Sequence, residues 1–278
     1  MKIVGLGRAG CAIADKLSAH PQYKIYKIDT GLKGLKKEGI YMLPEYERPE
    51  EYEEKCPSMK SFFKGVGGNV LFVVSGAGKV SGATLRILEN LQNCNIHILY
   101  IKPDSTFLSK TASLQENLVF NVLQQYARSA VIKKLYIVDN QVIESMLDEI
   151  PVLEYYDKLN ELISSTIHMI NVFDRSDPVY ETPVEDIETA RISTFGLVDT
   201  ATGEEQFFFS LDNARKKRYI YAISHKQLET DGTLFRTITD QTKEKSQDGS
   251  VKVNLEIHST QYEQNYGYVI ADATTIQE

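Results

Sequence analysis

Twice in the first third of the chain, a short apolar run leads directly into a glycine-rich turn and then into a helical pattern. Lys2–Val4 is followed by the turn Gly5–Gly10 (GLGRAG), and Asn69–Val74 (NVLFVV) is followed by the turn Gly76–Gly82. Runs with almost no polar residue are typical of strands covered on both faces, as in parallel sheets with crossover helices. The pattern therefore predicts a parallel sheet with helices packed against it.

Strand and helix patterns alternate through the rest of the first half. The further predicted strands are Tyr23–Ile28, Ile96–Ile101 and Leu135–Val138, and the predicted helices are Cys11–Ala19, Ala83–Leu91 and Leu114–Arg128. The acidic segment Glu45–Lys55 is expected to form a loop or a surface helix. Such alternation is typical of an α/β domain with a doubly wound parallel sheet, which we assign to residues 1–150.

The second half begins with a long helix. Pro151 is a helix-start signal, and apolar residues recur at helical spacing over Val152–Phe173, which would be roughly 30 Å long. Asp174–Asp186 is polar and is expected to be a linker. The segments predicted to follow are the strands Phe207–Ser210, Tyr219–Ser224, Val251–His258 and Tyr266–Asp272, and a helix over Thr233–Lys243. We therefore expect a central helix at 151–173 and a smaller C-terminal α+β domain at 174–278.

Charge and cysteine content exclude several classes of protein. The 278 residues carry a net charge of -7, which argues against nucleic-acid binding through a basic face. The cysteines Cys11, Cys56 and Cys94 lack the spacing of a zinc site and fit a reducing compartment. No apolar stretch approaches the roughly twenty residues of a membrane span, and the N-terminus runs straight into a strand. We expect a soluble, cytoplasmic protein that binds neither nucleic acid nor membrane.

The first glycine turn has the features of a phosphate site. Glycines let the backbone approach a phosphate closely, and a helix N-terminus offers unpaired N–H groups and a positive dipole. Taken alone, the turn fits the dinucleotide fingerprint, because Asp29 ends the second strand where a ribose-binding acid would lie. An NAD-dependent oxidoreductase is therefore one reading, and a tight turn without a ligand is another.

The second glycine turn changes this interpretation. Ser75–Gly82 (SGAGKVSG) is close to a P-loop, but its first glycine is displaced and Val80 separates Lys79 from Ser81. A dinucleotide site does not need a second glycine turn here. Two such turns at the carboxyl edge of one parallel sheet would hold a phosphate chain from both sides, although a packing turn is the alternative for each.

In order along the chain, these segments resemble motifs of the tubulin/FtsZ superfamily. Ile3–Cys11 (IVGLGRAGC) resembles its first phosphate loop, Ile28–Leu35 (IDTGLKGL) its NTDAQAL segment, and Phe72–Gly82 (FVVSGAGKVSG) its signature loop FVTAGMGGGTG. Tyr100–Pro103 (YIKP) is similar to VTKP, Val138–Asn140 (VDN) to IPN, and Pro151–Ile163 to the start of the long central helix. The resemblance covers roughly the first 200 residues.

The resemblance implies a binding site for GTP or GDP with Mg²⁺. The residues that it places at the phosphates are Gly5, Gly7, Arg8, Ala9, Gly10 and Cys11 in the first turn, and Gly76, Ala77, Gly78, Lys79, Val80, Ser81 and Gly82 in the second. It implies that Asn140 contacts the nucleoside, that Tyr156 stacks on the base, and that Asn160 reads the base edge. An aromatic face and an amide with both donor and acceptor suit these tasks.

Some features depart from the family pattern. Lys79 and Val80 replace glycines of the signature loop, and Lys79 could supply charge to a phosphate. Pro44–Pro57 replaces the loop that reads GAGANP in the family. The family's glutamate and arginine after the KP element fall at Phe107 and Thr111, so those nucleoside contacts are lost.

The catalytic loop of the family, NxDxxD, is also altered. If Val184–Ala190 is aligned on it, Asp186 matches the last acid, while Glu181 falls on the asparagine and Pro183 on the first aspartate. Glu185 and Glu181 could compensate, because a carboxylate within reach of a water is the chemical requirement. Another register uses Asn171, Asp174 and Asp177, and a charged linker without catalysis is the third reading.

The resemblance as a whole implies a GTPase that assembles head to tail with copies of itself, with hydrolysis completed by the acidic loop of the neighbouring subunit. The chain ends soon after its last predicted strand, so we expect a minimal member, nearer to plasmid- or phage-type filament proteins. The alternatives are a scaffold of the same fold that binds nucleotide without hydrolysis and the NAD-dependent oxidoreductase.

Overall fold

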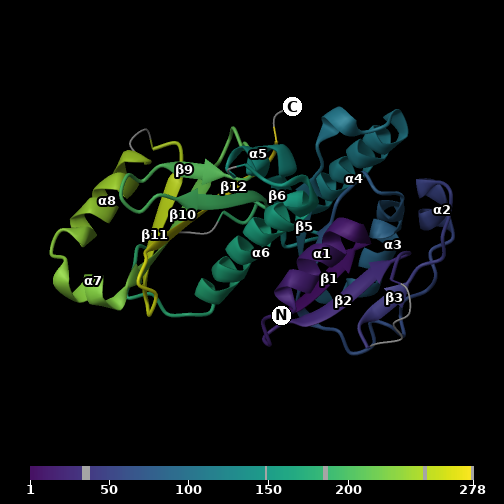
Figure 1. Cartoon of the computed structure of the whole chain (residues 1–278), viewed down its shortest axis with the longest axis horizontal. Coiled ribbons are helices and arrows are strands. Elements are labelled where there is room, and N and C mark those ends of the chain that lie inside the picture. The colour runs from purple at the N-terminus through teal and green to yellow at the C-terminus, as the bar shows by residue number, and fades with distance from the viewer. Residues whose placement is uncertain (33–37, 148, 184–186, 247–248, 277–278) are drawn as a thin grey trace. The chain divides into compact units, whose positions relative to one another are not determined.

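A parallel sheet in the order β3-β2-β1-β4-β5-β6 forms the centre of the first part of the computed structural model (Figure 1). The structure describes residues 1–32, 38–147, 149–183, 187–246 and 249–276. It divides into two units, Met1–Ser164 and Ser165–Glu278, and each is described by itself. This division falls within the segment 151–173 that the sequence assigns to a central helix.

All strand pairs of the first unit's sheet are parallel, as the apolar runs predict. The strands are β1 (Lys2–Leu6), β2 (Lys24–Asp29), β3 (Ile40–Met42), β4 (Gly68–Val74), β5 (Cys94–Lys102) and β6 (Lys134–Asp139). Val70 to Val74 are buried without exception, which explains why this run carries no polar residue. The predicted α/β class is confirmed.

Helices follow most of these strands. They are α1 (Gly7–Leu17), α2 (Pro49–Glu54), η1 (Lys79–Ala83), α3 (Thr84–Leu88), η2 (Glu89–Leu91), η3 (Ser105–Phe107), α4 (Lys110–Arg128), α5 (Asn140–Ser145), η4 (Val152–Glu154) and α6 (Tyr155–Phe173). Helix α1 buries Ile13, Ala14 and Leu17 against the sheet, which covers the apolar face of its strands.

Three local predictions in the first unit differ from the structure. Helix α1 begins at Gly7 rather than Cys11, because Gly7 at φ +71° lets the chain turn from strand to helix at once. The predicted helix Ala83–Leu91 is a short α-helix between two 3-10 turns. The short elements β3 and α5 were not predicted, since three and six residues are too few to show a clear period.

The second unit is built on a mixed sheet in the order β8-β12-β10-β11-β7, with β9 paired to β8. Its strands are β7 (Tyr180–Glu181), β8 (Ile192–Val198), β9 (Glu205–Phe207), β10 (Lys216–Ser224), β11 (Lys252–Thr260) and β12 (Tyr266–Ala273). Among the strand pairs formed by the described residues of this sheet, β10 and β11 are parallel and the others are antiparallel. This is the smaller α+β part that the sequence predicts.

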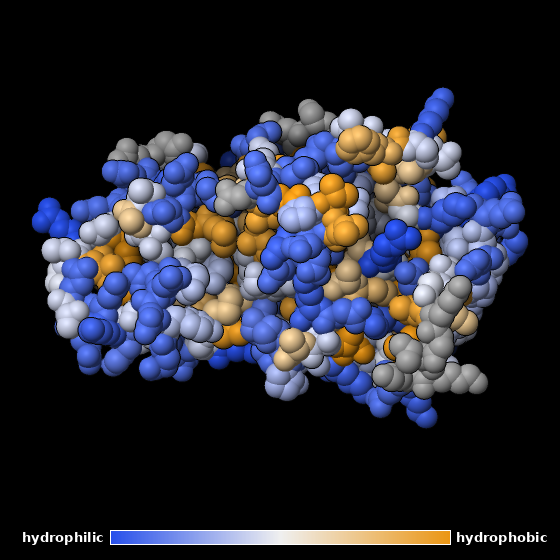
Figure 2. All heavy atoms as spheres, viewed as in Figure 1, coloured by the Kyte–Doolittle hydropathy of each residue, from blue (hydrophilic) through white to orange (hydrophobic). Residues whose placement is uncertain are grey.

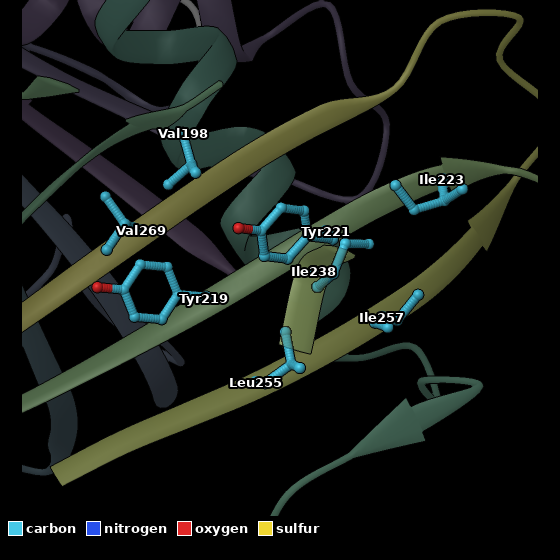
Figure 3. Packing of buried hydrophobic residues seen from close by; sticks show 8 residues of the cluster. All are labelled: Val198, Tyr219, Tyr221, Ile223, Ile238, Leu255, Ile257 and Val269. Atoms are coloured by element: carbon cyan, nitrogen blue, oxygen red, sulfur yellow. The ribbon is translucent and has the colours of Figure 1, made fainter. Parts of the chain in front are cut away.

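One hydrophobic cluster of the second unit lies between this sheet and helix α8 (Leu234–Glu244). Tyr219, Tyr221 and Leu255 of β10 and β11 belong to the same buried cluster as Ile238 of α8 (Figure 3). Each of these side chains is almost fully buried, so together they hold the helix on the sheet. A shorter helix, α7 (His225–Thr230), precedes α8 and was not predicted.

The predicted linker and two of the strands need correction. The segment Asp174–Asp186 contains the edge strand β7, which pairs with β11. Strand β8 was missed because its sequence, ISTFGLV, interrupts the apolar pattern with Ser193 and Thr194, although both are fully buried. Strand β9 lies earlier than the predicted Phe207–Ser210.

A partly buried charged cluster joins the end of α6 to the sheet of the second unit. Arg218 forms ion pairs with Asp174 and with Glu256, the latter at 2.6 Å between Nε and Oε1. His258, which is 2% exposed, places Nε2 3.5 Å from Glu256 Oε2. Burial raises the pKa of Glu256, but hydrogen bonds from His258 and Arg218 outweigh it and lower the pKa to about 2.

The surface seen in Figure 2 is mainly hydrophilic, and apolar side chains reach it in small patches. Among the described helices, none combines the length and the apolar character that crossing a membrane requires.

Candidate functional site

Both glycine turns follow neighbouring strands at the same edge of the first unit's sheet. Strands β1 and β4 run parallel with Gly5 opposite Val73, so Gly7 and Ser75 begin their turns side by side. Asp139 ends β6 at this carboxyl edge as well. In open α/β sheets, ligands bind in the crevice outside the carboxyl ends of the strands.

Four of the predicted phosphate glycines are required by the packing of the protein itself. A Cβ on Gly5 would overlap the carbonyl of Gly10, and a Cβ on Gly10 would overlap the carbonyl of Val73. In the second turn, a Cβ on Gly76 would overlap the Tyr100 hydroxyl, and one on Gly82 the carbonyl of Pro49. These glycines let neighbouring segments of the chain pack closely, which is the packing role considered for each turn.

Gly7 and Gly78 are different because a Cβ on either would meet no atom within 4 Å. Gly7 has φ +71°, a conformation that favours glycine for backbone reasons alone. Gly78 has φ -77° and ψ 143°, which any residue can adopt. Neither packing nor conformation requires a glycine at position 78. A ligand that lies in the open space beside it would give a reason for the missing side chain.

Ser81 shapes the second turn from inside. Its side chain is buried, and its hydroxyl lies 2.5 Å from the carbonyl oxygen of Gly76 and 2.6 Å from that of Gly78. The amide of Gln115 on α4 donates to the same hydroxyl at 3.3 Å. Ser81 therefore holds the backbone of the turn, and its hydroxyl is engaged within the protein.

Two cations flank the open glycines. Arg8 follows Gly7, Lys79 follows Gly78, and both side chains are exposed. Within the described residues neither forms an ion pair, so both charges are available to an anion at this edge. Sequence reasoning gave no role to Lys102, which ends β5 at this edge with its Nζ 4.9 Å from the ring centre of Phe120. The sequence signal that could have identified Lys102 is its place at the end of a strand, in the YIKP segment.

The other residues of the two predicted phosphate loops are less available. Cys11 is buried, and burial chiefly raises the pKa of its thiol to about 12, so the thiol stays neutral. Its Sγ lies 3.5 Å from the carbonyl oxygen of Gly5. Ala9, Ala77 and Val80 are half-buried and contribute backbone rather than side-chain chemistry.

The predicted nucleoside residues lie at the start of α5 and of α6. Asn140 is the first residue of α5, directly after β6, and Asn160 lies in the second turn of α6. Both amide side chains are half-buried, and neither forms a hydrogen bond within the part of the chain that the structure describes. Tyr156 is 69% exposed, with its ring 5.1 Å from that of Tyr155 in a T-shaped arrangement.

Polar contacts fix the first turns of α6 beside α1 and α5. Lys16 of α1 forms an ion pair with Asp157 at 2.8 Å, and the Tyr155 hydroxyl donates to Glu144 of α5 at 2.7 Å. The structure therefore brings the start of α6 to the helix that follows the first glycine turn. Whether Tyr156 and Asn160 contact a base remains a prediction.

The predicted catalytic acids are only partly described. Asp186 and Glu185 lie outside the described residues, while Glu181 is exposed in β7 of the second unit. In the alternative register, Asn171 is buried in α6 and Asp174 is held by Arg218. The described residues contain no cluster of three or more His, Cys, Asp or Glu that could hold a metal ion.

Comparison with known proteins identifies the fold. No family model matches the chain, and no curated protein matches its sequence. Solved structures match over nearly its whole length: CetZ from Methanosaeta thermophila has 14% identity, a TM-score of 0.73 and coverage of 99% of this chain and 86% of that one. FtsZ from M. jannaschii has 11% identity, a TM-score of 0.71 and coverage of 99% and 88%. TubZ from Bacillus thuringiensis serovar israelensis has 12% identity, a TM-score of 0.73 and coverage of 98% and 86%.

The chain thus has the tubulin/FtsZ fold, and the resemblance seen in its sequence motifs is confirmed at the level of the fold.

Proposed function

We propose that this protein binds a guanine nucleotide at the carboxyl edge of the first unit's sheet. The observation that carries the proposal is the pair of open glycines, Gly7 and Gly78, on turns that follow neighbouring strands. Helix α1 begins at the first of these turns, and its N-terminal N–H groups suit a phosphate. The similar TubZ structure is described as a GTPγS-form protofilament, which supports a guanine nucleotide as the ligand.

Each part of the nucleotide has a proposed contact. Backbone N–H groups of the two turns hold the phosphates, and Arg8 and Lys79 add positive charge. Tyr156 stacks on the base, while the side-chain amides of Asn140 and Asn160 hydrogen-bond to the nucleoside. Mg²⁺ is held mainly by phosphate oxygens and water, because it needs only one or two carboxylates from the protein. When bound, the ion would neutralise phosphate charge.

We further propose that copies of the chain assemble head to tail. Phe107, Val152 and Leu153 are 85%, 90% and 99% exposed, and the last two are adjacent in η4, just before α6. Exposed apolar residues that gather in one place mark interaction surfaces. A heterologous contact between unlike faces repeats into a filament, and the similar TubZ structures are protofilaments.

We propose that GTP hydrolysis takes place between neighbouring subunits. Asp186, Glu185 and Glu181 of one subunit would position a water at the nucleotide of the next, since a carboxylate can accept its proton. Phosphate release should occur with wild type and fall at least about a hundredfold in Asp186→Ala, as expected for loss of a general base. Tight GTP binding without phosphate release from wild type would instead identify a non-hydrolysing scaffold.

Sedimentation tests the assembly. Wild type should pellet with a non-hydrolysable GTP analogue and remain in the supernatant with GDP. A matched run with an ATP analogue controls for non-specific aggregation. Equal, monomeric behaviour in all nucleotides at high protein concentration would exclude the filament.

A further inference from the structure

Two adjoining surface pockets of the first unit, which share Leu85 of α3, form a groove between α4 on one side and α2 and α3 on the other. Its upper part is lined by Pro49, Glu50 and Glu53 of α2 and by Leu118 of α4. Its lower part continues past α3 to Val131, and Leu85 of α3 lines both parts. We call this feature the α3–α4 groove.

The wall formed by α4 is an apolar stripe whose first two members are exposed and whose last two are half-buried. Leu114 and Leu118 are 63% and 58% exposed, and Val122 and Tyr126 follow on the same face at intervals of four residues. Val131, just after the helix, is also 58% exposed. From Leu114 to Tyr126 the stripe is roughly 18 Å long at the rise of an α-helix, enough to receive several turns of a second helix.

The opposite rim is acidic. Glu50 and Glu53 of α2 are both exposed, and within the described residues neither forms an ion pair. Their neighbour Glu51, by contrast, is paired with Lys55 at 2.8 Å. The upper part of the groove therefore presents apolar side chains along one wall and the negative charges of Glu50 and Glu53 along the other.

We propose that the α3–α4 groove binds a basic amphipathic helix of another protein. Its apolar face would cover Leu114 and Leu118, and lysine or arginine side chains would reach Glu50 and Glu53. An apolar stripe against a groove with charges at the rim is the usual arrangement when a helix is recognised. The upper part of the groove is also lined by Ser81 and Gly82 of the second glycine turn, so binding of the helix is tested in the absence of nucleotide.

A second copy of this chain is a poor occupant for the same face. A contact between identical grooves would bring Glu50 and Glu53 of the two copies together, and like charges at an interface repel. The chain also carries a net charge of -7, which disfavours such a pairing further. Charge complementarity therefore favours a basic partner.

The probe is a fluorescein-labelled peptide of about 18 residues, roughly 27 Å as a helix, with leucine at every third or fourth position and lysine elsewhere. We expect saturable binding to wild type by fluorescence anisotropy, weakening as salt is added. A matched peptide with glutamate in place of lysine should bind at least about tenfold more weakly, because the rim is acidic. Hydrogen exchange should show protection within residues 110–128 and 49–54.

Two variants locate the site. Leu118→Ser should weaken binding at least about tenfold, as expected for a central apolar contact, and Glu50→Gln with Glu53→Gln should weaken it and reduce its salt dependence. Phe235→Ser removes a side chain that is 50% exposed in the second unit and should leave binding unchanged. All four positions are exposed, so circular dichroism should show folded proteins.

Three results would overturn the proposal. The first is no saturable binding of the lysine peptide to wild type, and the second is equal affinity for wild type, Leu118→Ser and the glutamine variant. The third is a dimer of wild type, seen by analytical ultracentrifugation without peptide, that Leu118→Ser abolishes, since the occupant would then be a second copy.

Discussion

Replacing Gly78 by alanine separates a ligand-binding role of the second turn from a structural one. The free protein has room for the methyl group, since no atom lies within 4 Å of it, and φ -77° suits alanine. Unfolding stability should therefore be unchanged or rise by about 0.4–1 kcal/mol, because alanine restricts the unfolded chain. If a phosphate approaches the backbone here, the methyl group blocks it, and the dissociation constant for GTP should rise at least about tenfold, or 1.4 kcal/mol.

Gly76→Ala is the matched control, two residues away in the same turn. Its methyl group would overlap the Tyr100 hydroxyl, which donates to Glu116 at 3.0 Å in the buried contact with α4. Overpacking costs about 1–3 kcal/mol, and breaking a buried hydrogen bond costs about 1–3 kcal/mol more. This variant should thus lose about 2–6 kcal/mol of unfolding free energy, a large share of the stability of a typical domain.

Urea unfolding followed by circular dichroism gives the stabilities, and isothermal titration calorimetry with GTP gives the affinities. The expected result is a stable Gly78→Ala protein with weak binding and an unstable Gly76→Ala protein. Normal GTP affinity in a stable Gly78→Ala protein would refute the reasoning, because the open space beside Gly78 would then have no ligand.

Three further outcomes are expected. Ser81→Ala should lower the unfolding free energy by about 0.5–1.5 kcal/mol in urea titrations, because the second turn loses an internal hydrogen bond; no change would mean that water replaces it. Glu256 has a folded pKa of about 2, below its ordinary 4.5, so its ion pair with Arg218 stabilises the protein above pH 4.5 and is lost as the pH falls toward 2. Urea midpoints measured at neutral and acidic pH should show this loss in wild type and a weaker dependence in Glu256→Gln; identical profiles would assign the acid sensitivity to other groups. Leu153→Asp should abolish pelleting with a GTP analogue while leaving GTP affinity within about threefold, since Leu153 is 99% exposed; unimpaired pelleting would place the assembly contact elsewhere.

The sheet of the first unit could be predicted because its strands are buried on both faces. The run from Val70 to Val74 has no polar residue, and each turn after such a run contains glycine. Burial on both faces requires apolar residues throughout the run, so such a strand can be recognised from the local sequence alone. The carboxyl edge, and with it the neighbouring positions of Gly7 and Ser75, follows from the parallel order of the strands.

The sequence could not predict which glycines are required for packing and which have open space beside them. Gly76 is needed because Tyr100 comes from β5 and Glu116 from α4, and Gly82 because Pro49 comes from α2. These contacts join residues far apart in the chain, so the local pattern of the turn is the same for a packing glycine and for an open one.

Buried polar residues concealed strand β8 for a similar reason. Ser193 is fully buried because its hydroxyl donates to Asp272 of β12 at 2.6 Å. The sequence shows a serine where a core strand would carry an apolar residue, and only the paired strand explains it.

Nucleotide selectivity tests the central claim most directly. Wild-type protein is titrated with GTP, ATP and NADH under the same conditions, with Gly78→Ala as the control for the site. The account predicts saturable binding of GTP that Gly78→Ala weakens, and little binding of ATP or NADH. Binding of NADH without binding of GTP would contradict it and favour a dinucleotide enzyme.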